Sequence, residues 1–273
     1  MSPLVLKEIS HGVALLTLNR PERANTWTVA LEAELFGLLR DAVDDPEVRA
    51  IVITGAGKTF CPGADAEELA ETSQGGPGTK PHLRPPMTFP TTVPKPIIAA
   101  INGACAGIGL AFALECDIRF VSSQAKLTTS FARRGIMAEH GIAWTLARLT
   151  GPSTALDLLL SARVILGTEA AALGLADSVT EPEEVLPAAM EFARELVRNS
   201  SPAAMGTIKR QVYEGLESTH DEARILSIRH WLGHLRHHDD FKEGITSFME
   251  KRQPEFAPWD PATPADPRPL PTD

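Results

Sequence analysis

Cysteine is scarce in this chain of 273 residues, a length that can bury one sizeable core. The three cysteines, Cys61, Cys105 and Cys116, are an odd number at irregular spacing. Neither a disulfide framework nor a metal site is typically spaced in this way. We therefore expect all three to be small buried residues of a protein from a reducing compartment.

Long apolar runs and basic clusters are also missing. No apolar run reaches the roughly 20 residues that a membrane span needs, and residues 1–10 lack the pattern of a signal peptide. The net charge is −9 and the pI is near 5.4, so neither nucleic acid nor a membrane is expected as a partner. His234, His237 and His238 lack the cysteine neighbours of a zinc motif, and we predict no metal site. We expect a cytoplasmic location.

The most informative stretch is residues 97–118, IIAAINGACAGIGLAFALECDI. Its β-branched start predicts a strand, its Gly/Ala-rich middle a tight turn, and its apolar end, Ile108–Leu114, a buried helix. Glycines in the turn allow backbone conformations that a Cβ would forbid. The first N–H groups of such a helix have no intrahelical partner, so they suit an anion, or a carbonyl oxygen that becomes one.

A Gly-x-Gly pair alone is a weak signal, because small residues also suit close packing of a helix on a strand. The stretch is not a phosphate loop, since it has no Gly-Lys-Ser/Thr. A similar strand and small-residue turn come earlier, at residues 49–54 and at Phe60–Asp65 (FCPGAD), and a third round covers residues 118–149. The repetition predicts an α/β fold of stacked strand-strand-helix turns.

The chain divides into three predicted parts: a core at 1–200, a C-terminal helical region at 201–256, and a proline-rich, poorly ordered tail at 257–273. In the helical region, Thr219-x-x-Glu222 is a capping box that opens a long helix. Within the core, residues 73–96 hold seven prolines and show no helical or strand period. We expect a mobile lid there, over the two glycine turns; an exposed insertion without a role is the alternative.

Five motifs resemble the crotonase (enoyl-CoA hydratase/isomerase) superfamily, over residues 4–256. They are Leu18-Asn19-Arg20-Pro21, Pro62-Gly63-Ala64-Asp65, Asn102-Gly103 to Gly109, Cys116-Asp117-Ile118 and Phe248-Met249-Glu250-Lys251-Arg252. Each is weak alone, but their order and spacing together are specific. The resemblance implies a crotonase-like spiral with a C-terminal helical region that forms homotrimers, often paired into hexamers. It also implies an acyl-CoA thioester as ligand, with coenzyme A as part of the substrate and no separate cofactor.

In this family, two main-chain N–H groups hold the thioester oxygen while an enolate forms. Carried over by resemblance, these donors are the amides of Ala64 and Ile108. Because they are main-chain groups, the isoleucine side chain does not remove the function, and each such donor is worth ~3 kcal/mol. The resemblance also implies contacts to substrate or coenzyme A from Arg23, Ala24, Ala64, Asp65, Gly107, Ile108, Phe248 and Lys251. Phe248 and Lys251 are three residues apart, which predicts one helix face, with Lys251 at the phosphates.

The two glutamates of typical hydratases are missing. By resemblance their positions hold Ala111 and Phe131, and neither side chain can move a proton. One carboxylate remains nearby: Glu139, at a place where some double-bond isomerases and other divergent relatives carry a catalytic carboxylate. His140 is a second candidate.

The neighbours of Glu139 in the sequence are mostly apolar, and we expect them to desolvate its carboxylate. The apolar neighbours are Ile136, Met137, Ile142 and Trp144. The alternative is a helix-start residue paired with Arg133 or Arg134.

Three functions are compatible with these residues. The first is isomerisation of a 3-enoyl to a 2-enoyl thioester, because a single acid/base such as Glu139 can remove a proton from one carbon and return it to another. The second is enoyl-CoA hydration in fatty-acid degradation, a lyase reaction that is harder with one carboxylate. The third is a non-catalytic acyl-CoA-binding protein. Acyl-CoA hydrolysis or decarboxylation, and the acyl-chain length, are left open.

Overall fold

A computed structural model of the chain describes residues 2–73 and 85–259. Its larger sheet has the strand order β1-β2-β3-β5-β7-β10. These strands are β1 (Val5–Ser10), β2 (Val13–Leu18), β3 (Ala50–Gly55), β5 (Ile97–Ile101), β7 (Ile118–Ser122) and β10 (Ser178–Thr180). All neighbours are parallel except β1 and β2, which form an antiparallel pair.

A second sheet, of order β4-β6-β8-β9, gives the fold its repeating form. Its strands are β4 (Thr59–Cys61), β6 (Ala104–Ala106), β8 (Lys126–Thr128) and β9 (Ile165–Leu166). Each of β3, β5 and β7 is followed by a strand of this second sheet and then by a helix, in turn α2 (Ala66–Ser73), α4 (Ile108–Leu114) and α5 (Ile142–Thr150). The predicted spiral of strand-strand-helix turns is therefore confirmed.

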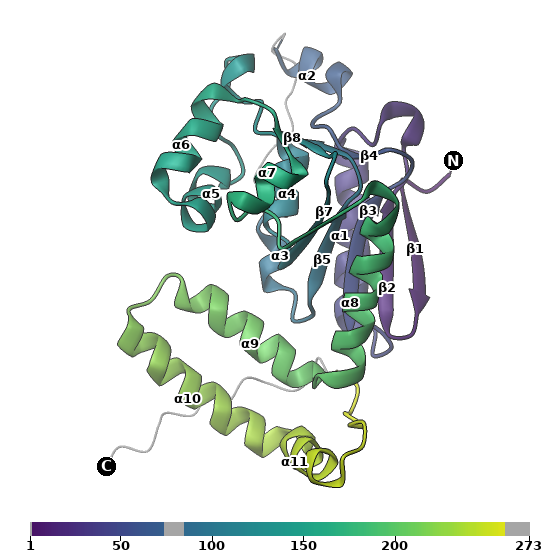
Figure 1. The fold of residues 1–273 in the computed structure, drawn as a ribbon, viewed down its shortest axis with the longest axis vertical. Helices are drawn as coiled ribbons and strands as arrows, with labels where there is room; N and C mark the ends of the chain where they lie inside the picture. The colour runs from purple at the N-terminus through teal and green to yellow at the C-terminus, as the bar shows by residue number, and fades with distance from the viewer. Residues whose placement is uncertain (1, 74–84, 260–273) are drawn as a thin grey trace.

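Both faces of the larger sheet are buried, because alternate side chains of a strand point to opposite faces. Ile51 and Ile53 of β3 face a core that includes α1 (Val29–Asp44) and α4. Val52, between them, faces α8 (Val185–Asn199), which lies along the sheet in Figure 1. The central strands read as continuous apolar runs for this reason.

The remaining helices lie around this core or below it (Figure 1). Those in the core region are η1 (Pro21–Arg23), α3 (Phe89–Thr92), η3 (Ala132–Arg134), α6 (Pro152–Ser161), α7 (Gly167–Ala172) and η4 (Pro182–Glu184). The C-terminal helices α9 (Pro202–Gly215), α10 (His220–His237) and α11 (Asp240–Glu250) stand apart from the sheets. The capping box that opens α10 is present, and the role of 201–256 in trimerisation stays a prediction.

Several details differ from the expectations or fall outside them. Strand β1 was not expected. Residues 74–84 of the predicted lid lie outside the described residues, and the rest of that segment contains α3. Phe256, the last residue before the predicted tail, accepts a hydrogen bond at its carbonyl oxygen from the Arg49 guanidinium, 3.1 Å away, and Trp259 in the tail lies against Gly206. The predicted burial of the three cysteines is confirmed, and their reducing compartment stays a prediction.

Candidate functional site

Two glycine turns, at Gly63 and at Gly107, meet where the parallel strands β4 and β6 of the second sheet end. The first turn follows β4 and the second follows β6, and these strands are parallel neighbours. Gly63 and Gly107 both have positive φ, 121° and 52°, which favours glycine. A Cβ added to Gly107 would lie 3.8 Å from the Gly63 Cα atom, so the two backbones are in van der Waals contact.

The two predicted donors, the N–H groups of Ala64 and Ile108, belong to the residues that directly follow these two glycines. Within the described part of the chain, neither N–H has a hydrogen-bond partner. Their neighbours do: Gly107 N donates to Thr128 O at 3.1 Å, and Asp65 N donates to Trp27 O at 2.9 Å. Ala64 and Ile108 are also partly exposed, whereas Gly63 and Gly107 are buried. The two turns thus present two free main-chain donors to one small region.

Cys61, at the end of β4, packs the first turn against α4. A Cβ added to Gly109 would lie 2.8 Å from the Cys61 Sγ atom, so only glycine fits there without displacing the thiol. Burial raises the pKa of the Cys61 thiol to about 12. The thiol stays neutral and is a packing group rather than a nucleophile.

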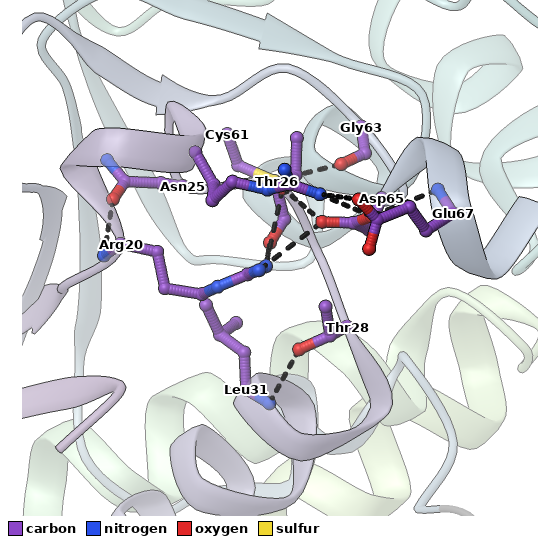
Figure 2. A network of polar contacts seen from close by, with 10 residues as sticks. Arg20, Asn25, Thr26, Thr28, Leu31, Cys61, Gly63, Asp65 and Glu67 are labelled. Carbon is purple, nitrogen blue, oxygen red and sulfur yellow. Dashed lines mark hydrogen bonds and ion pairs between the residues drawn. The ribbon is translucent and has the colours of Figure 1, made fainter. Parts of the chain in front are cut away.

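A polar network around Asp65 fixes the other end of the first turn (Figure 2). Its Oδ2 accepts from Thr26 Oγ1 at 2.9 Å and from Arg20 Nη2 at 3.3 Å, and its Oδ1 accepts from Glu67 N at 3.1 Å. Burial alone would raise the pKa of this carboxyl, but the hydrogen bonds and the nearby arginines outweigh it and hold the pKa below its usual value. The side chain is only 5% exposed, so its carboxylate faces protein groups.

The predicted ligand contacts Arg23 and Ala24 lie beside this network. Arg23 Nη2 pairs with Glu67 Oε1 at 2.7 Å and with Asp65 Oδ1 at 3.5 Å, and its side chain is 43% exposed. Ala24 caps η1 in the left-handed conformation and is exposed. The contacts of Arg23, Ala24 and Asp65 with substrate or coenzyme A stay predictions.

Ala111 and Phe131, the two positions where the resemblance implies missing glutamates, hold buried apolar side chains. Ala111 is 2% exposed and Phe131 is 4% exposed, and both belong to the main core cluster. Ala111 N donates to Gly107 O within the first turn of α4, so this residue lies close to the second glycine turn.

Glu139 lies in the loop between η3 and α5, and its surroundings differ from the expectation. Its side chain is 52% exposed, and Met137 is 78% exposed, so the expected apolar enclosure is not found. The described residues show no ion pair of Glu139 with Arg133 or Arg134 either, and Arg133 Nε donates to Ser161 O at 2.8 Å. His140 Nε2 lies 3.9 Å from Glu139 Oε2. Both side chains are accessible from solvent, and their catalytic roles stay predictions.

Phe248 and Lys251 do not share a helix face, and that prediction is wrong. Helix α11 ends at Glu250, and Lys251 caps it in the left-handed conformation with φ 55°. Phe248 is 82% exposed. Helix α11 lies at the end of the molecule opposite to α2 and β4 (Figure 1). One chain therefore keeps both residues away from its own glycine turns.

The structure adds two residues that the sequence did not single out. Trp27 is 2% exposed and forms an isolated parallel bridge with Ala64. Glu115, 5% exposed, follows α4 and accepts a hydrogen bond from Thr145 Oγ1 at 2.8 Å. Burial raises the pKa of Glu115, and this hydrogen bond offsets part of the rise. No local sequence pattern marks either contact.

Among residues 2–73 and 85–259, no cluster of three or more His, Cys, Asp or Glu side chains could hold a metal ion. None of the helices in those ranges has the length and apolar character to cross a membrane.

Comparisons with known proteins point to one family. The family model described as Enoyl-CoA hydratase/isomerase matches residues 8–258. The chain is 30% identical to 1,2-epoxyphenylacetyl-CoA isomerase of Escherichia coli, over 94% of this chain and 99% of that protein. It is 35% identical to a probable enoyl-CoA hydratase of Rhodobacter capsulatus, over 91% of this chain and 96% of that protein.

Solved structures give the same result. The crystal structure of a probable enoyl-CoA hydratase/isomerase from Mycobacterium abscessus has a TM-score of 0.85 and 31% identity, over 93% of this chain and 99% of that chain. An enoyl-CoA hydratase from Mycobacterium marinum has a TM-score of 0.67 and 46% identity, over 77% of this chain and 96% of that chain.

Proposed function

The chain belongs to the enoyl-CoA hydratase/isomerase (crotonase) family, and from this premise we propose that it moves the double bond of an enoyl-CoA thioester through an enolate. The observation that supports the proposal is the contact between Gly63 and Gly107, each of which is followed by a residue, Ala64 or Ile108, whose N–H has no hydrogen-bond partner among the described residues. Preorganised donors of this kind stabilise negative charge as it develops on a thioester oxygen.

The proposed reaction needs one group that both takes and returns a proton. Glu139 removes a proton from C2 of a 3-enoyl thioester, and the electron pair moves onto the thioester oxygen, which accepts from Ala64 N–H and Ile108 N–H. The protonated Glu139 then returns the proton to C4, and the double bond re-forms between C2 and C3. Nothing is gained or lost, so substrate and product have the same mass.

The side chains at positions 111 and 131, where typical hydratases are expected to carry glutamates, favour isomerisation over hydration. Ala111 and Phe131 are buried apolar side chains, so neither can orient or deprotonate a water molecule. One relative is named as an isomerase and others as hydratases, and both reactions use an enolate in this scheme. Hydration, with water activated by another group, is the alternative that the experiment below separates.

We also propose that the site is completed in a homotrimer, or in a hexamer made of two trimers. The C-terminal helices expose large apolar side chains that a single chain leaves uncovered: Ile208, Val212, Trp231, Phe241, Ile245, Phe248 and Met249. This region would bring Phe248 and Lys251 of one copy to the coenzyme A bound by another. Cytoplasmic location, and coenzyme A as part of the substrate, stay predictions.

The experiment compares matched 2-enoyl-CoA and 3-enoyl-CoA substrates with three proteins: the wild type, Glu139→Gln and Glu47→Gln. Glu47 is an exposed glutamate in the turn after α1 and serves as the matched control. Product mass separates the reactions, because hydration adds the mass of water and isomerisation adds nothing. We expect turnover of the 3-enoyl substrate by the wild type and the control, and a loss of about a hundredfold or more in Glu139→Gln.

Three results would change the proposal. Full activity of Glu139→Gln would remove Glu139 from the mechanism. A product heavier by one water would favour hydration. Binding of acyl-CoA without turnover of either substrate would favour a non-catalytic binding protein.

A further inference from the structure

Trp27 is joined to the first glycine turn through its own backbone. Trp27 N donates to Gly63 O at 2.8 Å, and Asp65 N donates to Trp27 O at 2.9 Å. These two bonds bracket Ala64 in the manner of a parallel bridge. Because successive peptide groups of an extended chain point to opposite sides, the bracket turns Ala64 N–H away from Trp27. The position of residue 27 thus fixes the direction of the first donor.

The side chain of Trp27 is joined to the helix that carries the second donor. Its indole ring packs on the ring of Phe112, with centroids 5.3 Å apart and planes tilted by 46°. Phe112 lies in α4, one turn after Ile108, and is fully buried. If the indole were displaced, its contact with α4 would change, and so would the backbone hydrogen bonds that join residue 27 to the first turn.

A hydrogen bond fixes the orientation of this indole. Its Nε1 donates to Glu32 Oε2 at 2.9 Å, and Trp27 and Glu32 are each 2% exposed. Glu32 belongs to α1, whose apolar side chains Leu31, Leu35 and Phe36 are fully buried in the main core. The indole is thus also held by α1, a helix that is itself well packed in the core.

We propose that Trp27 is a positioning residue that sets the two N–H donors, of Ala64 and Ile108, relative to each other. The inference rests on the proposed function, in which both donors hold one thioester oxygen. It follows from the contacts above, because one residue brackets the first donor with its backbone and packs on the helix of the second with its ring. Stabilisation by such donors depends on their placement, and a displacement of about 1 Å can cost a hundredfold in rate.

Phe36 provides a matched control. It is fully buried and also packs on Phe112, with centroids 6.1 Å apart, but it forms no bracket around Ala64. Phe36→Leu therefore opens a cavity beside the same ring without loosening the first turn. Trp27→Leu opens a cavity and also removes the indole contacts, whereas Trp27→Phe keeps a ring against Phe112 and removes only the bond to Glu32.

The first readout is hydrogen exchange of the bonded amides of Trp27, Asp65 and Ala111, which needs no substrate. We expect faster exchange at all three in Trp27→Leu, and wild-type exchange at Trp27 and Asp65 in Phe36→Leu. The second readout is kinetic: kcat should fall about tenfold or more in Trp27→Leu, with KM within about threefold and the pH profile unchanged. Trp27→Phe should lose only about threefold.

A third readout uses acetoacetyl-CoA, an enolisable thioester whose enolate absorbs in the near ultraviolet. Trp27→Leu should bind it with nearly wild-type affinity and yield less enolate, because the donors act on the oxyanion. Unchanged exchange at Trp27 and Asp65, or an equal loss of kcat in Phe36→Leu, would overturn the inference. If the wild type turns over no enoyl-CoA, the proposed function fails and the exchange experiment still decides the role of Trp27. Should Trp27→Leu not fold, Trp27→Phe gives the same comparison with a smaller effect.

Discussion

Replacing Asp65 with asparagine tests the network that holds the first glycine turn (Figure 2). The substitution keeps the size of the side chain and removes its charge. The carboxylate is 5% exposed and accepts from Thr26 Oγ1 at 2.9 Å, from Glu67 N at 3.1 Å and from Arg20 Nη2 at 3.3 Å. Arg23 Nη2 also lies 3.5 Å from Oδ1. All four partners are donors, so each needs an acceptor in the folded state.

The magnitude follows from these partners. An asparagine has one oxygen, which can replace either Oδ1 or Oδ2, and its NH2 group then faces donors on the other side. Hydrogen bonds to charged groups contribute about 1.5–3 kcal/mol each, and a partner left unsatisfied adds to the loss. We therefore expect Asp65→Asn to lower the free energy of unfolding by about 3 kcal/mol at pH 7.

The loss should depend on pH. The network holds the pKa of Asp65 below its usual value, while the unfolded chain has the ordinary value of about 3.9. A carboxyl with a lowered folded pKa contributes stability that is fully present above the unfolded pKa and is lost as the pH falls through the folded pKa. The difference between wild type and Asp65→Asn should be constant from pH 7 to pH 5 and shrink below about pH 4.

Urea unfolding at pH 7, 5, 4 and 3, at one protein concentration, measures this difference. Glu191→Gln is the control, because Glu191 forms an exposed ion pair with Arg198 on α8 and should have little effect. A difference that stays the same from pH 7 to pH 3 would show that the charge of Asp65 does not stabilise the fold. A loss no larger than that of the control would refute the reasoning from its hydrogen bonds.

Two further predictions concern buried charged groups outside the glycine turns. Lys209→Met should lower the free energy of unfolding by about 3 kcal/mol at pH 7. Lys209 Nζ lies 2.7 Å from Asp117 Oδ2, so the substitution leaves that carboxylate without its cation. A urea midpoint equal to that of the wild type would contradict this prediction. Glu115→Gln should stabilise the protein at pH 7 by on the order of 1 kcal/mol, since a carboxyl whose folded pKa is raised by burial is unfavourable when ionised. That gain should vanish as the pH falls towards about 4, where the glutamate is protonated in the unfolded chain as well, and a pH-independent difference between pH 7 and 4 would refute the assignment to charge.

The central strands could be predicted from the sequence because burial on both faces leaves a plain signal. Strands β3 and β5 are buried at every position, so each reads as one apolar run bounded by turn residues. Strand β1 left no such signal. Only Val5 in it is buried, and the strand is an edge strand whose place is fixed by its backbone pairing with β2. Pairing of this kind does not show in side-chain periodicity.

The sequence could predict the parts of the site that are formed by the main chain of the glycine turns. It could not predict the parts formed by contacts between segments far apart in the sequence. Gly63 and Gly107 require positive φ, and this need is visible as small residues after a strand. The contacts of Trp27 with Ala64 and Phe112 join positions far apart in the sequence, so no local pattern marks them. The surroundings of Glu139 were misjudged because apolar letters in a loop do not imply burial.

The C-terminal helices show a different limit of prediction from sequence. The helices themselves can be predicted, but the sequence does not show what covers their apolar side chains. Trp231 of α10 is 56% exposed, and Phe248 of α11 is 82% exposed. Large apolar groups left open in one chain are commonly covered by another. Helix α11 also lies at the end opposite to the glycine turns (Figure 1), so Phe248 and Lys251 can reach coenzyme A held at such turns only if those turns belong to another copy. The predicted assembly and the predicted coenzyme A contacts of these two residues therefore depend on each other: a monomer in solution would exclude both.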